Sequence, residues 1–342
     1  MHGKLAIWVE PPYRQDELFN SGSPVNRDDC LSAFRLLKES LSHSGWICHT
    51  QDIFLASREI PDTVLFLEIP RVPLAGIMGA WLGKTRNIAL LSECEVIRPE
   101  NWKTAGQGQF DAIFTWDTRL VDNKRCFEMH FANAFPKESL VQPEEKKAFC
   151  LMIAAHKKRS HPLELYSERE RAVRWFEKNH PEEFDLYGVG WDSFVFDGPR
   201  LIRGLNRIKP LTGLLRPRFP SYKGKIGEKR EIMRAYKFSI CYENAREIPG
   251  YITEKIFDSF FAGCVPVYWG APDISRYVPE DCFIDKRKFA TYEQLYDFMK
   301  NMSEKDYQLK LQAIKKFLAS PAAYPFSDVC FAETVSRVIT NA

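Results

Sequence analysis

The chain has 342 residues, enough for two domains of ordinary size, and 45% of them are apolar, as is usual in globular proteins. It contains no run of eighteen or more apolar residues, so no transmembrane helix is expected, and its formal net charge is only +3. The nine cysteines are scattered and show no CxxC spacing, which argues against a disulfide framework and a zinc site of that type. Cys150, Cys241 and Cys264 lie in apolar runs, so we expect buried, reduced thiols and a cytoplasmic location.

The first half of the chain alternates predicted strands with a predicted helix. Residues 5–9 form an apolar run that is too short for a signal peptide and is expected to be a strand. Residues 28–41 carry apolar side chains at helical spacing, which predicts an amphipathic helix. Three further strands are predicted at residues 63–67, 87–91 and 112–116. This alternation is typical of an α/β domain.

A charged segment with two prolines, residues 136–147, is the predicted boundary between two domains. Beyond it the pattern restarts with a strand, a helix and a strand, at residues 148–154, 163–178 and 184–188. The tail holds three predicted helices, at residues 292–300, 304–318 and 328–339. We therefore expect two doubly wound α/β domains, residues 1–145 and 146–342, in which the last helix can pack back on the first domain.

The most informative stretch, residues 236–270, combines a strand, a polar turn, a helix and a second strand. Its polar side chains follow the first strand and open the helix: Glu243, Asn244, Tyr251, Thr253, Glu254 and Lys255. Open α/β sheets bind ligands at the carboxyl ends of their strands, beside helix N-termini that attract phosphate. The stretch therefore predicts an anion-binding crevice to which Lys255 adds a full positive charge.

Three sequences within it, YKFSICYEN, YITEK and GCVPVYWG, have the order and spacing of the signature of the α1,3/α1,4-fucosyltransferases, glycosyltransferase family 10. The chain resembles a bacterial-type member and departs from the pattern at Tyr242, where the family usually has Phe. The resemblance implies the GT-B architecture, two Rossmann-type domains facing a cleft, with the acceptor bound by residues 1–145 and the GDP-sugar by residues 146–342. The alternative is an ordinary strand–helix–strand unit with Glu254 and Lys255 on a solvated helix face.

A sugar transferase must stabilise the diphosphate that leaves its donor. The chain contains no Asp-x-Asp motif, so we expect no metal or other cofactor and assign this role to protein cations. Lys255 is one candidate. Arg171 is the second, because the segment that it opens, RAVRWFEKNHPEEFDLYG, resembles the family segment that starts at a diphosphate-binding arginine. Arg169 and Arg174 compete for this assignment.

The remaining donor-site candidates are polar groups suited to a sugar nucleotide. Glu243 and Asn244 have hydrogen-bonding groups for ribose hydroxyls. Tyr251 has a ring that packs on a sugar, and Glu254 is suited to bind a sugar hydroxyl or to stabilise positive charge at the anomeric carbon. The resemblance places Tyr251, Glu254 and Lys255 in the donor site, and Thr253 lies among them. The alternatives are a packing tyrosine and a carboxylate at a helix N-terminus.

An inverting transferase needs a carboxylate to take the proton from the acceptor hydroxyl. The family places a Glu for this role just after a strand of the N-terminal domain. Glu93 follows the predicted strand 87–91 and is our first candidate, with Glu95 as its competitor, because alternation along an extended chain puts both on one side. Glu68, at the end of another strand, ranks third, and the alternative is that these are solvated loop acids.

Positive charge gathers in one stretch, residues 200–237, which holds twelve Lys or Arg against Glu228 and Glu231. A solvated basic surface explains this, and so does attraction to a nucleotide diphosphate or to the anionic inner face of a membrane carrying lipid-linked acceptors. The stretch lacks regularly spaced aromatic residues and any nucleic-acid motif, so we do not expect nucleic acid as a partner.

The resemblance implies an inverting, metal-independent enzyme that moves fucose from GDP-fucose to a hydroxyl of a glycan, α1,3 or α1,4 to N-acetylglucosamine or glucose in a surface polysaccharide or lipopolysaccharide. Two alternatives stay open at this stage. One is the same fold with another nucleotide-sugar donor, and the other is a non-catalytic protein that binds sugars or nucleotides.

Overall fold

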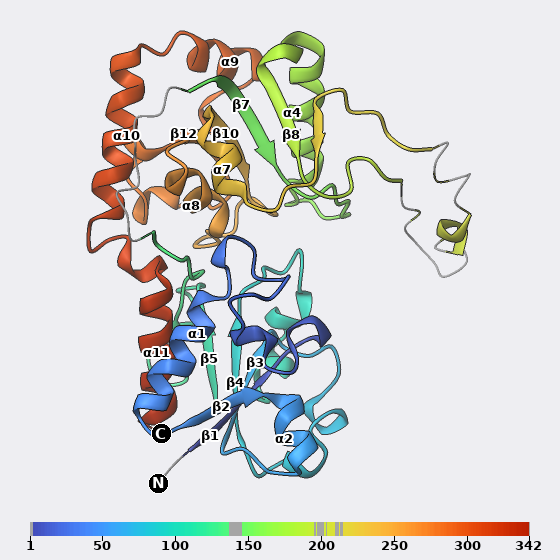
Figure 1. Ribbon diagram of the computed structural model, residues 1–342, viewed down its shortest axis with the longest axis vertical. Helices are drawn as coiled ribbons and strands as arrows, with labels where there is room; N and C mark the ends of the chain where they lie inside the picture. Colours follow the sequence, from blue (N-terminus) through green and yellow to red (C-terminus); the bar gives the residue numbers. More distant parts are fainter. Residues whose placement is uncertain are drawn as a thin grey trace.

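The computed structural model describes residues 3–136, 146–194 and 215–341, together with residues 196, 202, 204–208 and 212. These residues form two lobes, one above the other in Figure 1, and each lobe is built on a six-stranded parallel sheet. The predicted boundary segment, residues 136–147, lies outside the described residues except at its ends. None of the described helices is both long and apolar enough to cross a membrane.

The first sheet has the strand order β2-β1-β3-β4-β5-β6. Its strands are β1 (Lys4–Trp8), β2 (Ile47–Thr50), β3 (Thr63–Leu67), β4 (Arg86–Leu91), β5 (Ala112–Thr115) and β6 (Cys126–Glu128). The four predicted strands are present, whereas β2 and β6 are too short, and β2 too polar, to stand out in the sequence. The order reverses direction between β1 and β3, and such a switch point opens a crevice at the carboxyl ends of the strands.

The second sheet has the order β12-β11-β10-β7-β8-β9, the Rossmann order, with its switch point between β7 and β10. Its strands are β7 (Ala148–Ile153), β8 (Phe184–Tyr187), β9 (Tyr222–Gly224), β10 (Tyr236–Tyr242), β11 (Val265–Trp269) and β12 (Ile284–Asp285). β10 and β7, the two strands at the switch point, read as nearly continuous apolar runs because helices cover both faces of a doubly wound sheet. As predicted, Cys150, Cys241 and Cys264 are buried here.

Helices cover the faces of both sheets. In the first lobe these are α1 (Ser32–His43), α2 (Gln51–Ser57) and the short α3 (Thr104–Gln107). In the second they are α4 (Tyr166–Asn179), α7 (Lys229–Arg234), α8 (Glu254–Phe261), α9 (Tyr292–Lys300) and α10 (Glu304–Leu318). The predicted helix over residues 28–41 begins only at Ser32, because residues 27–29 form a tight turn in which Asp28 and Asp29 have φ of 52° and 58°.

The last helix, α11 (Asp328–Thr340), leaves the second lobe and lies along α1 in the first (Figure 1). Phe331, Val335 and Ile339 enter the apolar core beneath the first sheet. Two polar contacts add to this packing, one from Arg86 to the carbonyl of Val338 at 2.9 Å and one between the hydroxyls of Ser40 and Ser336 at 3.1 Å. The chain therefore ties its two lobes together at a second place.

Candidate active site

A cavity of about 500 Å³ lies between the two lobes, at the carboxyl ends of β7 and β10. Both lobes contribute to its walls. Side chains from the first lobe include Tyr13, Arg27, Asp28, Cys30, Glu93 and Phe131. Polar side chains from the second include Lys157, Arg169, Lys229, Asn244, Tyr251, Thr253, Glu254, Lys255 and Asp258. Because this place is also the switch point of the second sheet, the cavity lies where doubly wound folds bind their ligands.

Helix α8 points its N-terminus at the cavity, and a buried carboxylate holds that end in place. Glu243, fully buried after β10, accepts hydrogen bonds from the amide (2.8 Å) and the hydroxyl (2.7 Å) of Thr253, the N-cap residue of α8. It also lies 3.3 Å from Nζ of Lys255. The carboxylate of Glu243 is thus bonded within the protein and does not line the cavity, and ribose binding by Glu243 stays a prediction.

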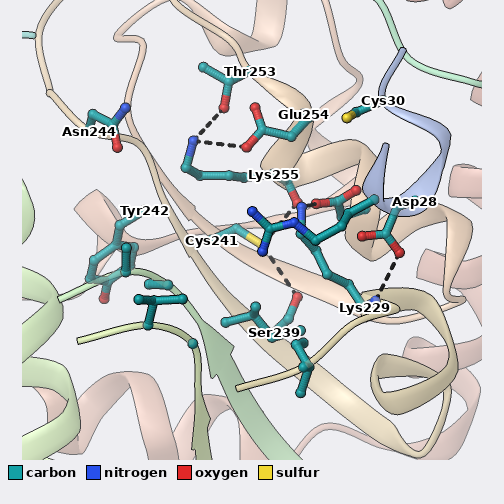
Figure 2. A pocket seen from close by; sticks show the side chains of 18 of the residues that line it. Asp28, Cys30, Lys229, Ser239, Cys241, Tyr242, Asn244, Thr253, Glu254 and Lys255 are labelled. Carbon is teal, nitrogen blue, oxygen red and sulfur yellow. Dashed lines mark hydrogen bonds and ion pairs between the residues drawn. The ribbon is translucent and has the colours of Figure 1, made fainter. Parts of the chain in front are cut away.

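Lys255 and Glu254 form the charged pair in the first turn of α8 (Figure 2). Nζ of Lys255 donates to the Thr253 hydroxyl at 2.8 Å and lies 3.4 Å from Glu254. Burial lowers the pKa of Lys255, but Glu254 and Glu243 outweigh it and hold this pKa above its usual value. Burial likewise raises the pKa of Glu254, yet Lys255 and Lys229 bring it to about 2. Both groups are therefore charged at neutral pH.

A second cation at the cavity is Arg169, not Arg171. Arg169 is only 4% exposed, and its Nη2 donates to the carbonyl of Tyr242 at 2.7 Å and to Oδ1 of Asn244 at 3.1 Å. The Arg171 side chain is 68% exposed, pairs with Glu168 and lines a separate hollow. Residues two apart on a helix lie about 200° apart around its axis, so α4 can present only one of these arginines to the cavity.

One hydroxyl connects the two lobes across the cavity. Tyr251, from the turn before α8, donates from Oη to Oε2 of Glu93 at 3.0 Å and accepts from Nδ2 of Asn244 at 3.2 Å. Burial raises the pKa of Glu93, partly offset by the Tyr251 hydrogen bond and the charge of Lys255. A partly desolvated carboxylate with a raised pKa is a suitable proton acceptor near neutral pH.

The other two candidate bases lie elsewhere. Glu95 is exposed and does not line the cavity, because the chain turns at Cys94, whose carbonyl accepts from the amides of Ile97 and Arg98. The alternation that left Glu93 and Glu95 equivalent in the sequence therefore ends at this turn. Glu68 lies behind Glu93 and contacts its backbone rather than the cavity.

Sequence reasoning missed an inter-lobe contact on the opposite wall of the cavity. Oδ1 of Asp28 accepts from the amide of Lys229 at 2.9 Å (Figure 2). Nζ of Lys229 pairs with Asp258 at 2.7 Å. In the sequence, the two successive acids at residues 28 and 29 indicate the start of a helix. In the structure both have a positive φ, and Asp28 faces the second lobe. Lys229 was counted within a diffuse basic stretch, which carried no sign of this role.

No group of three or more His, Cys, Asp or Glu side chains that could hold a metal ion occurs among the described residues. In the part of the chain that the structure describes, the cations that line the cavity are Arg27, Lys157, Arg169, Lys229 and Lys255. Four of the five come from the second lobe, so the positive charge is concentrated on the side of the cavity where α8 begins.

Comparisons with known proteins agree with this geometry. The family model described as glycosyltransferase family 10 (fucosyltransferase), C-terminal part, matches residues 217–311. An α-(1,3)-fucosyltransferase of Helicobacter pylori is 32% identical over 142 residues, which are 36% of this chain and 28% of that protein. An α-(1,4)-fucosyltransferase of Arabidopsis thaliana is 35% identical over 72 residues, 21% of this chain and 18% of that protein.

Solved structures share the fold over nearly the whole chain. An α1,3-fucosyltransferase with GDP-fucose has a TM-score of 0.54 and 16% identity, over 98% of this chain and 90% of that one. HepE of Anabaena in complex with UDP-glucose has a TM-score of 0.57 and 10% identity over the full length of both chains.

Two facing Rossmann-type lobes with a cavity between them define a GT-B-type protein. The family model narrows this likeness for one part of the chain: residues 217–311 match the C-terminal part of glycosyltransferase family 10, the fucosyltransferases. The aligned segments span 28% and 18% of the two relatives, so the activity, substrates and partners of the whole protein are a matter for proposal.

Proposed function

We propose that the protein is an inverting fucosyltransferase that moves fucose from GDP-fucose to a hydroxyl of a glycan. The observation that carries this proposal is the Glu93–Tyr251 contact. It brings a carboxylate of the first lobe to the same cavity as the N-terminus of α8, Lys255 and Arg169 of the second. A proton acceptor and an anion-binding end thus face one space, as a displacement at a sugar carbon requires. The relatives named as fucosyltransferases favour fucose as the sugar.

In this proposal the diphosphate of the donor lies against the N-terminus of α8. Helix N–H groups and the charge of Lys255 face the negative charge that grows as the sugar–phosphate bond breaks. Both hydrogen bonds that Arg169 makes with described residues use Nη2, so its other nitrogens can bind a phosphate oxygen. With these fixed cations in place, the transfer needs no metal ion.

Transfer then proceeds in one displacement. The acceptor hydroxyl gives its proton to Glu93 while its oxygen attacks the anomeric carbon from the side opposite GDP. The bond from that carbon to the phosphate oxygen breaks with its electron pair, GDP leaves, and the configuration at carbon is inverted. Tyr251 holds the carboxylate of Glu93 through the attack, and the ionised Glu254 stabilises the positive charge that develops on the sugar.

The remaining roles follow from which lobe supplies each wall. We assign donor binding to residues 146–342 and acceptor binding to residues 1–145, whose loops supply Tyr13, Arg27 and Phe131. An N-acetylglucosamine or glucose unit of a surface polysaccharide or lipopolysaccharide, fucosylated at O3 or O4, fits the relatives named α-(1,3) and α-(1,4). The nine cysteines are free thiols, which supports a reducing, cytoplasmic compartment.

A separate proposal concerns the basic stretch, residues 200–237, and anionic lipid at the inner face of the membrane. Several of its described cations already pair with acids: Arg216 with Asp192, Lys223 with Asp185, Lys229 with Asp258 and Lys237 with Glu304. Arg200, Arg203 and Lys209 lie outside the described residues. Co-sedimentation with phosphatidylglycerol vesicles tests the contact: binding lost when Arg218 and Lys225 become Glu supports it, and no binding rejects it.

Calorimetry with GDP-fucose, GDP-mannose and UDP-galactose, without metal and with EDTA present, tests the donor assignment. We expect the guanine donors to bind selectively, GDP-fucose tightest, and acceptor glycans to be fucosylated under the same conditions. Preference for a uridine donor would indicate another nucleotide-sugar as the donor. HepE, which shares the fold, was solved in complex with UDP-glucose, so the fold is compatible with such a donor. Binding without turnover for any acceptor would identify a non-catalytic sugar-binding protein, and activity restored only by manganese would contradict the metal-independent mechanism.

A further inference from the structure

Glu68 lies directly after β3 and reaches the backbone of the neighbouring strand end rather than the cavity. Oε1 of its carboxylate accepts from the amide of Ser92 at 3.1 Å and from that of Glu93 at 3.0 Å. Glu68 does not line the cavity, so it does not touch a substrate bound there. One half-buried carboxylate thus binds the two successive N–H groups that follow β4, including that of the candidate base.

The opposite side of the same peptide segment is held equally firmly. Asn101, fully buried, donates from Nδ2 both to Oε2 of Glu68 and, at 3.1 Å, to the carbonyl of Glu93. The same carbonyl accepts from Nε1 of Trp102 at 3.2 Å. The amide and the carbonyl of Glu93 are therefore both bonded to side chains, and no ladder of regular secondary structure is involved.

Further contacts fix the residues on either side. Nε1 of Trp116 donates to the carbonyl of Ser92 at 2.8 Å, and Oδ1 of Asn101 accepts from the amide of Ile69 at 3.0 Å. The amide oxygen of Asn101 is thus bonded to Ile69, and its amide nitrogen is bonded to Glu68 and Glu93. These partners determine the orientation of the Asn101 side chain. The backbone of the segment that carries Glu93 is therefore fixed by hydrogen bonds to side chains.

The backbone at Glu68 adopts a strained conformation. Its φ is +74°, in the region that favours glycine, and a non-glycine residue there costs about 1 kcal/mol or more. The strain turns the Glu68 carboxylate back toward β4, whereas an ordinary extended residue would continue the direction of β3. A glycine would relieve the strain but would lose the carboxylate.

The environment of the Glu68 carboxylate also reduces the stability of the folded protein. Burial raises the pKa of the Glu68 carboxyl to about 7, although the hydrogen bonds from Asn101, Glu93 and Ser92 lower it; the nearby charge of Glu93 raises it further. Two carboxylates kept close together in a partly desolvated place destabilise the folded protein relative to amides or apolar groups of the same size.

We propose that Glu68 is a positioning residue that aims the carboxylate of Glu93 into the cavity. This inference rests on the proposed function of Glu93 as the base. It gives a role to a strained, half-buried acid that lies one strand away from the candidate base. Reactions of this kind are sensitive to placement, and a displacement of about 1 Å can cost roughly 100-fold in rate.

The test compares Glu68→Gln and Glu68→Gly with the wild-type enzyme. In Glu68→Gln, the amide oxygen can still accept from Ser92 and Glu93, but the new NH₂ faces the NH₂ of Asn101. We expect kcat to fall about 10- to 100-fold, with unchanged affinity for GDP and an unchanged KM for the donor. In Glu68→Gly the strain is relieved, but the amides of Ser92 and Glu93 and Nδ2 of Asn101 lose an acceptor, so the thermal midpoint should fall and kcat should fall at least as far as in Glu68→Gln.

Two further variants make the result specific. The double variant Glu68→Gln/Asn101→Asp restores an acceptor opposite the new NH₂. It also removes the Nδ2 bond to the carbonyl of Glu93, which Nε1 of Trp102 still binds, so we expect only part of the lost kcat to return. Asp111→Asn is the matched control, because Asp111 accepts from the amide of Asn87 at 2.7 Å, at the other end of β4. We expect this control to change stability at most and to leave kcat unchanged.

The outcomes separate this inference from the proposed function. An active Glu93→Gln would reject Glu93 as the base. An inactive Glu93→Gln beside a wild-type kcat in Glu68→Gln would overturn the positioning role alone. Loss of donor affinity in Glu68→Gln would also overturn the positioning role. So would a loss of turnover as complete as in Glu93→Gln with no recovery in the double variant, because that result would identify Glu68 as the base.

Discussion

The hydroxyl of Tyr251 donates to Oε2 of Glu93 at 3.0 Å, across a separation of 158 residues in the chain. This one contact joins a turn of the second lobe to a loop of the first. Tyr251 also packs its ring on Trp116 of the first lobe, with 5.2 Å between ring centres. The geometry of the candidate base therefore depends on how the two lobes sit against each other, and donor-side and acceptor-side chemistry are coupled through one side chain.

Replacing Tyr251 by Phe tests that coupling, because it removes the hydroxyl and keeps the ring. We expect kcat to fall about 10- to 100-fold, since Glu93 loses the bond that orients it. Steady-state kinetics with saturating donor measure this. Tyr307→Phe is the control: its hydroxyl donates to the carbonyl of Lys237 at 3.2 Å, away from the cavity. Equal losses in both variants would mean that the effect is one of folding.

The pH profile provides a second test of Glu93. Burial raises the pKa of Glu93 above the usual 4.5, and a base must be ionised, so kcat/KM should fall as the pH drops through this raised pKa. The Tyr251 hydrogen bond lowers that pKa, so the acid limb of Tyr251→Phe should move to higher pH. Glu254, with a pKa of about 2, stays ionised throughout and should not contribute to the limb. A shift to lower pH would contradict the assignment.

Glu93→Gln and Glu95→Gln separate the two acids that the sequence left equivalent. We expect Glu93→Gln to lose about 10²- to 10⁴-fold in kcat while GDP binding survives, because only proton transfer is removed. Glu95 is exposed and turned away, so Glu95→Gln should retain wild-type kinetics. Radiolabelled donor and an acceptor panel provide the measurement. The reverse pattern would move the base by two residues.

The sequence predicted the two α/β sheets well because their central strands are continuous apolar runs that local pattern alone identifies. β3, α9 and α10 have the predicted bounds. The same reasoning placed Asn244, Tyr251, Thr253, Glu254 and Lys255 together, since they follow one strand and open one helix. The features that the sequence predicted correctly are those that depend on residues close to one another in the chain.

The sequence does not resolve placements that depend on the direction of a side chain. Glu243 was expected in the cavity, but a helix N-terminus lies close enough to use its carboxylate, and sequence spacing does not show this. Arg171 was preferred to Arg169 from a resemblance, and only the phase of α4 distinguishes them. Glu68 ranked last among the acids because its positive φ, which gives it a role, is not encoded in any local pattern.

The two arginines of α4 give a direct prediction for donor binding. Arg169→Ala should weaken GDP binding, by about 10- to 100-fold if one charge-assisted contact to phosphate is lost. Arg171→Ala should leave the dissociation constant unchanged, because that side chain is largely exposed and pairs with Glu168. Calorimetric titration with GDP measures both. Because Arg169 is buried, Arg169→Lys serves as the milder variant, and its thermal midpoint shows whether the fold is intact.

Glu243 is predicted to be a determinant of stability. Glu243→Gln removes the charge that faces Lys255 and the N-terminus of α8, and should destabilise the protein by roughly 1–3 kcal/mol. Gly270→Ala perturbs the same carboxylate without changing its charge. The added Cβ would lie 2.4 Å from Cγ of Glu243 and force that side chain to move. Both variants should lower the thermal midpoint. Gly76→Ala, where a Cβ meets no atom within 4 Å, is the control, and a midpoint as low as that of Gly270→Ala would contradict the packing argument.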